Sequence, residues 1–146
     1  MKVSTKGRYG LRIMLELALR HGAGPVLVPD IARNQDLPLK YVHVLAGGLK
    51  AAGLLRTVRG PGGGLELARD PEAITPLDVV EALEGRIAGV DCTRDPGLCP
   101  RAAECVAREV WGEMADAMAR ALARRNLAEL ADQVRSRSGG LEAYMI

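Results

Sequence analysis

The chain has 146 residues, enough for one globular domain or for a small domain with an oligomerisation segment. Apolar residues make up 48% of it, but aromatic residues contribute only 3% and Phe is absent, so Ala and Leu must build the core. This composition favours packed helices over a β-sandwich. No apolar run approaches the ~20 residues of a membrane span, and the N-terminus lacks a signal-peptide pattern, so we expect a cytoplasmic protein with no membrane partner.

The net charge of +2 conceals an uneven distribution along the chain. Residues 1–60 hold ten Lys or Arg and three Asp or Glu, which gives +7, whereas residues 61–146 hold ten and fifteen, which gives −5. This difference predicts that the first half binds a polyanion. A solvated basic face with no partner is the alternative that charge alone leaves open.

Three helices are expected in the first third of the chain. Apolar residues at helical spacing predict a helix over residues 5–21, which a Gly- and Pro-containing segment ends. A short second helix follows, with Pro29 in its first turn, and a third spans residues 38–52. The short proline-marked turn between the second and third helices is typical of a helix-turn-helix.

A β-hairpin is expected next. Residues 54–58 are partly β-branched and residues 65–68 alternate apolar and polar side chains, with a glycine-rich turn between them. A helix-turn-helix followed by a hairpin is the order of a winged helix. We therefore predict a mostly α-helical fold with a small β-hairpin, that is, a winged helix-turn-helix plus a long C-terminal dimerisation helix.

The glycine-rich turn has the composition of a wing that reaches into DNA. Glycine lets the backbone approach a surface closely, and Arg59 can enter a narrow minor groove, where the negative potential is enhanced. The glycines lack the spacing of a nucleotide-binding loop. A purely structural turn is the alternative, although it needs fewer glycines than this one has. The candidate wing residues are Arg59, Gly60, Pro61, Gly62, Gly63 and Gly64.

Further candidates for DNA contact lie on the third helix and at the N-terminus. Lys40 can neutralise a phosphate, and Tyr41 and His43 can donate hydrogen bonds to phosphates or base edges. His43 would equally suit a plain surface position. The basic residues at the start of the first helix add contacts to phosphates that do not depend on sequence. These residues are Lys2, Lys6, Arg8 and Arg12.

The second half of the chain is expected to hold a capped helix, a loop and a long helix. Thr75, Pro76 and Asp78 have the pattern of a helix start, residues 85–103 read as a loop, and Asn126 can cap a further short helix. The long helix, over about residues 104–125, has an apolar stripe without an equally long partner, so we expect it to pack against a second subunit. Folding back over the first helix is the alternative.

These elements divide the chain into three parts. We expect a winged-helix DNA-binding domain at residues 1–75, a linking helix and cysteine-bearing sensor loop at residues 76–103, and a dimerisation helix with a C-terminal tail at residues 104–146. No Ser/His/Asp set or other enzyme motif is apparent, so no enzymatic activity is expected.

All three cysteines, Cys92, Cys99 and Cys105, lie within fourteen residues in or next to the predicted loop. An odd number in a cytoplasmic chain argues against a disulfide framework. Three thiolates in one loop could hold zinc or an iron–sulfur cluster, but each of these needs a fourth ligand, and the spacing matches neither a ferredoxin nor a zinc ribbon. Three unrelated thiols are the alternative.

Over nearly its whole length the sequence resembles the Rrf2 family of bacterial winged-helix regulators, and within it the IscR-like and NsrR-like branches that carry an iron–sulfur cluster. The residues that carry the resemblance are the start Lys-Val-Ser-Thr-Lys-Gly-Arg-Tyr at 2–9, Ile31-Ala32, Val-Arg-Gly-Pro-Gly-Gly-Gly at 58–64, the three cysteines and Val110-Trp111.

The resemblance implies a homodimer, formed through the long helix, that binds partly palindromic promoter DNA. It implies that residues 40–44, which include Val44, belong to the recognition helix, and that the glycine turn enters the minor groove. It further implies that Cys92, Cys99 and Cys105 hold a 2Fe–2S or 4Fe–4S cluster that reports iron, cluster supply, oxidants or nitric oxide.

The chain departs from both branches at the fourth cluster ligand. The IscR type has a histidine three residues after the last cysteine, where this chain has Arg108, which cannot coordinate a metal. The NsrR type uses an aspartate from the first helix, where this chain reads Lys6-Gly7-Arg8. The remaining choices for the fourth ligand are Glu104, Glu109, a carboxylate of the other subunit, or water.

The function expected from these features is that of a DNA-binding transcription repressor controlled by an iron–sulfur cluster. One alternative is a cluster-free regulator of the CymR type, in which a protein partner or thiol oxidation sets DNA affinity. That branch typically manages without this cysteine trio. A third possibility, from another class, is a small metal- or redox-handling protein, which the acidic second half would suit but the basic first half and the wing would not.

Overall fold

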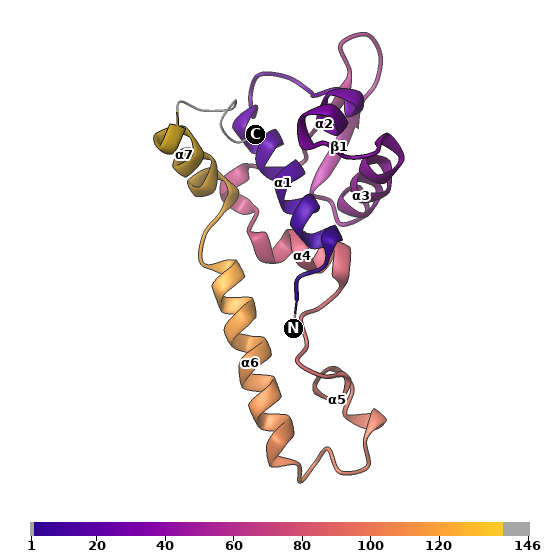
Figure 1. The fold of residues 1–146 in the computed structure, drawn as a ribbon, viewed down its shortest axis with the longest axis vertical. Helices are drawn as coiled ribbons and strands as arrows, with labels where there is room; N and C mark the ends of the chain where they lie inside the picture. The colour runs from indigo at the N-terminus through magenta and orange to yellow at the C-terminus, as the bar shows by residue number, and fades with distance from the viewer. Residues whose placement is uncertain (1, 139–146) are drawn as a thin grey trace.

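Three helices precede a hairpin in the computed structural model of the chain, which describes residues 2–138 (Figure 1). The helices are α1 (Thr5–Leu19), α2 (Val28–Gln35) and α3 (Leu39–Ala51). The predicted boundaries hold to within two residues. The turn of the helix-turn-helix begins at Asp36, which has a left-handed backbone with φ of 52° and ends α2. Pro38 then precedes α3, so the predicted helix-turn-helix is confirmed.

The predicted hairpin is also present. Strands β1 (Leu55–Val58) and β2 (Gly64–Leu67) pair antiparallel, with Leu55 opposite Leu67 and Val58 opposite Gly64. The hairpin is attached to the segment before α2, because Val26 and Leu65 exchange two backbone hydrogen bonds of 2.8 Å. This bridge fixes the base of the wing on the helix-turn-helix and leaves its tip extended.

Helix α4 (Pro76–Glu84) follows a short 3₁₀ turn, η1 (Pro71–Ala73), and starts as the sequence predicts. Thr75 and Asp78 form a reciprocal capping box, in which the Thr75 backbone N–H donates to Asp78 Oδ2 at 2.8 Å. The helix packs along α1, and Gly10 makes this possible because an added Cβ there would collide with Leu83 of α4.

The segment predicted as a loop at residues 85–103 contains two helical turns, α5 (Asp91–Arg94) and η2 (Pro96–Leu98). Its side chains cap its own backbone: Asp95 accepts from the Gly97 N–H at 3.0 Å, and the Thr93 hydroxyl donates to the Val90 carbonyl at 2.6 Å. Such local bonds stabilise turns that hydrophobic periodicity does not reveal.

Two helices complete the described chain, α6 (Val106–Ala123) and α7 (Leu127–Ser138). A further helix follows the long helix α6 as expected, but α7 has twelve residues and is longer than the short helix predicted. Asn126 caps α7 as predicted, since its Oδ1 accepts from the Glu129 N–H at 2.9 Å. The predicted C-terminal tail, from residue 139 onward, lies outside the described residues.

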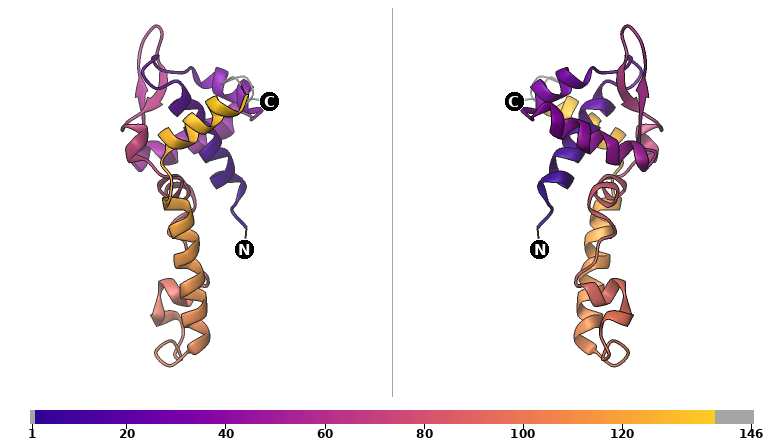
Figure 2. Two further views of the ribbon diagram at one scale, coloured as in Figure 1. Left: turned by 90° about the vertical axis from the view of Figure 1, so that its left-hand side faces the viewer. Right: turned by 90° about the vertical axis from the view of Figure 1, so that its right-hand side faces the viewer.

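The molecule consists of a body and an arm (Figures 1 and 2). In the body, α1 is covered by α2, α3, α4 and α7, and the core includes Ile13, Met14, Leu45, Leu49 and Leu127. The arm is formed by α6 together with residues 85–105. It projects from the body on the side opposite the hairpin tip. Among residues 2–138 no helix has both the length and the apolar character required to cross a membrane.

Candidate DNA-binding interface and cysteine loop

Helix α3 has one buried face and one exposed face. The buried face consists of Val42, Leu45, Ala46 and Leu49. The predicted DNA-binding residues Lys40, His43 and Val44 are all exposed, at positions that share the opposite face. Near the end of the helix, Lys50 Nζ donates to the Thr57 hydroxyl of β1 at 3.3 Å, which joins this face to the wing.

Tyr41 differs from its neighbours because its ring is half-buried. It meets the ring of Tyr9 of α1 edge to face, with the ring centroids 6.4 Å apart. The guanidinium groups of Arg8 and Arg12 lie 5.8 and 5.2 Å from the Tyr9 ring centroid. Tyr9 is thus a contact between α1 and α3 to which the sequence reasoning assigned no role, although it belongs to the motif at residues 2–9.

The basic N-terminal segment is fastened to the end of α4. Glu84 Oε1 accepts from the Ser4 backbone N–H at 3.0 Å, the Ser4 hydroxyl at 2.7 Å and the Gly7 N–H at 3.0 Å. Gly7 is required here, because a Cβ would collide with the Glu84 carboxylate. Lys2, Lys6 and Arg8 remain exposed on this anchored segment.

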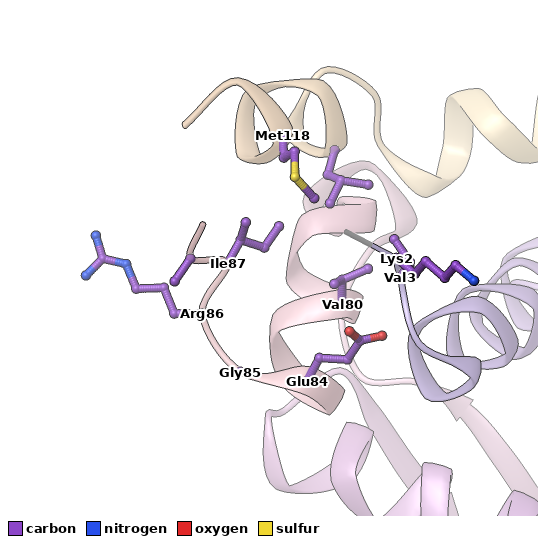
Figure 3. A pocket seen from close by; sticks show the side chains of 10 residues that line it. Lys2, Val3, Val80, Glu84, Gly85, Arg86, Ile87 and Met118 are labelled. Atoms are coloured by element: carbon purple, nitrogen blue, oxygen red, sulfur yellow. The ribbon is translucent and has the colours of Figure 1, made fainter. Parts of the chain in front are cut away.

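A cavity of about 200 Å³ lies beside this anchor, where the arm meets the body (Figure 3). Val3, Val80 and Met118 line it from the N-terminal segment, α4 and α6. Arg86 points away from it in Figure 3, and the Glu84 carboxylate is held by Ser4 and Gly7. The third charged lining residue is Lys2, so apart from Arg86 the lining offers one cation and one carboxylate that is already bonded, which defines no particular ligand.

The four glycines of the wing fall into two pairs. Gly60 and Gly62 have φ of 94° and 72° and open space around them, so they allow the tip to turn without a side chain. An added Cβ on Gly63 would collide with the Val58 and Gly60 carbonyls, and one on Gly64 with the Val26 backbone. The second pair thus has a packing role, while the first pair lies in the exposed tip.

The two other tip residues predicted to contact DNA, Arg59 and Pro61, are exposed beside Gly60 and Gly62. At the base of the hairpin, the Arg56 Nε donates to Glu66 Oε1 across the strands at 2.6 Å. Arg59 is therefore the arginine of the hairpin that lies at its tip, next to the open glycines.

A buried carboxylate holds the last turn of α2 against α1. Glu16 is 0% exposed, and its two oxygens accept from Asn34 Nδ2 at 2.7 Å and from Gln35 Nε2 at 2.6 Å. Arg20 lies 3.6 Å from the same carboxylate. Asn34 and Gln35 directly precede the turn at Asp36, so Glu16 fixes the position from which α3 starts. The charged residue inside the apolar run of residues 13–18 was the sequence feature that could have revealed it.

The three cysteines all lie in the arm, at boundaries of its short elements. Cys92 is in α5, Cys99 ends η2 and Cys105 directly precedes α6. All three are half-buried free thiols. The loop is held to α6 by the Arg108 Nε, which donates to the Cys92 carbonyl at 2.8 Å, and by Gly89, whose missing side chain allows contact with the Trp111 backbone.

The structure does not gather these thiols into a metal-binding group. Within residues 2–138, no three His, Cys, Asp or Glu side chains are arranged to hold a metal ion. Glu104 and Glu109, considered as fourth ligands, are exposed on the arm. Arg108, at the position of the IscR-type histidine, binds the backbone of Cys92 instead.

The outer end of the arm is apolar. Val106, Val110 and Trp111 are 71, 52 and 42% exposed, although they are large hydrophobic residues on one helix. The alternative that α6 folds back over α1 is not what the structure shows, because α7 occupies that position with Leu127 and Ala131 buried.

Comparison with known proteins places the chain in a family. The Rrf2 profile, described as an iron-dependent transcriptional regulator, matches residues 3–133. The regulator CymR of Bacillus subtilis is 41% identical over 145 residues, 99% of this chain and 98% of that protein. Protein rrf2 of Nitratidesulfovibrio vulgaris is 42% identical over 130 residues, 89% of this chain and 87% of the relative.

A solved structure of IscR from T. potens superposes with a TM-score of 0.76 at 32% identity, covering 99% of this chain and 96% of the other. The family profile and CymR are named as transcription regulators, in agreement with the winged helix and its exposed basic residues. The chain belongs to the Rrf2 family of transcriptional regulators.

Proposed function

We propose that this regulator is a cytoplasmic homodimeric repressor whose binding to double-stranded promoter DNA is controlled by an iron–sulfur cluster on Cys92, Cys99 and Cys105. The cluster reports iron, cluster supply or redox and nitric oxide stress. The observation that carries the proposal is that the only three cysteines of the chain share one fourteen-residue segment of the arm, all of them half-buried free thiols.

Cysteine thiols are suitable ligands for an iron–sulfur cluster, but the positions of these three thiols do not yet form a cluster site. Cysteine thiolates are the usual ligands of 2Fe–2S and 4Fe–4S clusters, and this segment supplies three of the four. The thiols do not surround a common metal position within the described residues, so they must converge further when a cluster is bound. The bound cluster would supply a group that changes with iron and redox state, while the protein residues hold the loop and bind DNA.

The DNA-binding assignment follows from the exposed face of α3, the wing and the N-terminal segment. In a winged helix of this kind the recognition helix enters the major groove, which admits an α-helix. The wing tip with Arg59 would enter the minor groove, and the anchored residues Lys2, Lys6 and Arg8 would contact phosphates. We propose residues 1–75 as the DNA-binding part, 76–103 as the sensor part and 104–146 as the dimerisation part.

The dimer assignment is supported by the apolar end of α6. Val106, Val110 and Trp111 are exposed, and burying them would stabilise a dimer by roughly 25 cal/mol for each Å² of apolar surface removed from water. The same helix of a second subunit would bury this surface in a symmetric pair. A dimer would also present two wings and two recognition helices to the two halves of a palindrome.

The cluster is tested on protein purified and kept without oxygen. We expect a visible iron–sulfur absorption spectrum with matching iron and sulfide contents, both lost in Cys92→Ala. Arg94→Ala is the matched control, since it changes another residue of α5 without removing a thiol, loses only a surface ion pair with Asp91 and should keep the spectrum. Colourless protein that takes up no iron or sulfide on anaerobic reconstitution would overturn the cluster proposal.

A CymR-type regulator without a cluster is the second candidate. It is favoured by the 41% identity to CymR and by Arg108, which holds the Cys92 carbonyl where an IscR-type histidine would stand. In that case the anaerobic protein is colourless, and its DNA affinity changes on thiol oxidation or on addition of a protein partner. The third reading, a metal- or redox-handling protein without a DNA role, is disfavoured because the relatives are transcription regulators.

A further inference from the structure

The exposed face of α3 has an unusual arrangement of residues. Lys40 and Lys50 lie near its two ends, and His43, Val44 and Gly47 lie between them at helical spacing. The two lysines are ten residues apart, about 15 Å along the helix axis. This span is comparable with the ~12 Å width of the major groove, so the lysines suit phosphates while the middle of the face meets base edges.

Val44 and Gly47, in the middle of this exposed face, do not contribute to the packing of the described chain. Val44 is 56% exposed, more than any other large apolar side chain in residues 2–89. Apart from its chain neighbours and the backbone of its own helix, Gly47 has no atom within 4 Å of the position of an added Cβ, whereas a Cβ on the adjacent Gly48 would lie 2.9 Å from Leu83 Cδ2. Gly47 therefore leaves a bare patch of helix backbone beside an exposed methyl-bearing side chain.

We propose that Val44 is a specificity-determining residue that reads the 5-methyl group of a thymine in the major groove, and that Gly47 lets the helix approach closely enough for this contact. This inference rests on the proposed placement of α3 in the major groove. The thymine methyl is the one apolar group that base edges present there, and aliphatic side chains are its usual partners. A charged or polar side chain at Val44 would serve phosphates or other base edges instead.

The test begins with selection of a duplex from a random pool by the full-length protein. Each dT of the selected site is then replaced by dU, which removes only the 5-methyl group. We expect one dT in each half-site at which this replacement weakens wild-type binding about fourfold, as for the loss of one buried methyl-sized group. Val44→Ala should bind the original duplex more weakly and should show no further loss at that dU.

His43→Ala is the matched control, because His43 is exposed beside Val44 and its loss should leave the response to that dU unchanged. Circular dichroism and thermal unfolding should show that Val44→Ala is folded, as its exposure predicts. An equal loss at dU for wild-type protein and Val44→Ala, or wild-type binding that ignores every dU, would overturn the inference alone. Failure to select any duplex would overturn the proposed DNA function and this inference with it.

Discussion

Replacing Glu16 by alanine should destabilise the protein by about 3–5 kcal/mol. The Glu16 carboxylate is fully buried and accepts hydrogen bonds of 2.7 and 2.6 Å from Asn34 and Gln35. Hydrogen bonds to a charged group contribute about 1.5–3 kcal/mol each, and their removal leaves two amide donors without an acceptor. Arg20 lies 3.6 Å from the same buried carboxylate, and the loss of this ion pair is included in the stated range.

The measurement is urea unfolding at one fixed protein concentration, because the stability of the proposed dimer would depend on concentration. With an m-value of roughly 1.5 kcal/mol/M, the midpoint of Glu16→Ala should fall by about 2–3 M. Glu66→Ala is the matched control. Its carboxylate pairs with Arg56 at 2.6 Å on the exposed hairpin, and its loss should cost less than about 1 kcal/mol. Equal effects of the two substitutions would refute the structural role of Glu16.

Three further predictions concern DNA binding, measured by fluorescence anisotropy. Arg59→Ala should weaken binding by about 1–3 kcal/mol, mainly at sites with a narrow minor groove, and an unchanged A·T preference would contradict the entry of Arg59 into the minor groove. Lys2→Ala should weaken binding to all sequences equally and reduce by about 1 the slope of the logarithm of affinity against the logarithm of salt concentration. A loss confined to one operator would argue against a phosphate contact. Gly47→Ala should raise the free energy of unfolding by up to about 1 kcal/mol but weaken DNA binding. Gly48→Ala is its control, since the added methyl group presses on Leu83 and should leave the DNA affinity unchanged. Equal DNA affinities of the two variants would refute the close approach at Gly47.

Local sequence patterns predicted the fold well where the stabilising contacts are local. Thr75 with Asp78, and Asn126 with Glu129, are three residues apart, so the starts of α4 and α7 could be read directly from the chain. The helix-turn-helix and hairpin were predictable for the same reason.

Contacts between distant residues could not be predicted from such patterns. Glu16 and Gln35 are nineteen residues apart, and Ser4 and Glu84 are eighty apart. The division of the wing glycines also depends on tertiary contact, since Gly64 is close to Val26 only after the hairpin has docked. The packing of α7 on α1 could not be predicted either. Both α6 and α7 carry an apolar stripe, and the sequence does not show which of the two helices covers α1.

For the proposed cluster site, the sequence indicated which residues could take part but not how they are arranged. Spacing and family resemblance selected Cys92, Cys99 and Cys105, but the way a loop is held depends on contacts such as that of Arg108 with the Cys92 carbonyl. From the sequence, Arg108 indicates only that a histidine ligand is absent at this position. The structure shows that Arg108 instead donates a hydrogen bond to the Cys92 carbonyl.

The most direct test of cluster-controlled repression is a DNA-binding titration of the same anaerobic preparation before and after the cluster is removed with a chelator. The selected duplex is the probe, and Cys92→Ala is measured in parallel. A coupling of about 1–3 kcal/mol predicts that the two forms differ roughly 5- to 150-fold in affinity, with no such difference in Cys92→Ala. Equal affinities of the cluster-loaded and cluster-free protein would contradict the account.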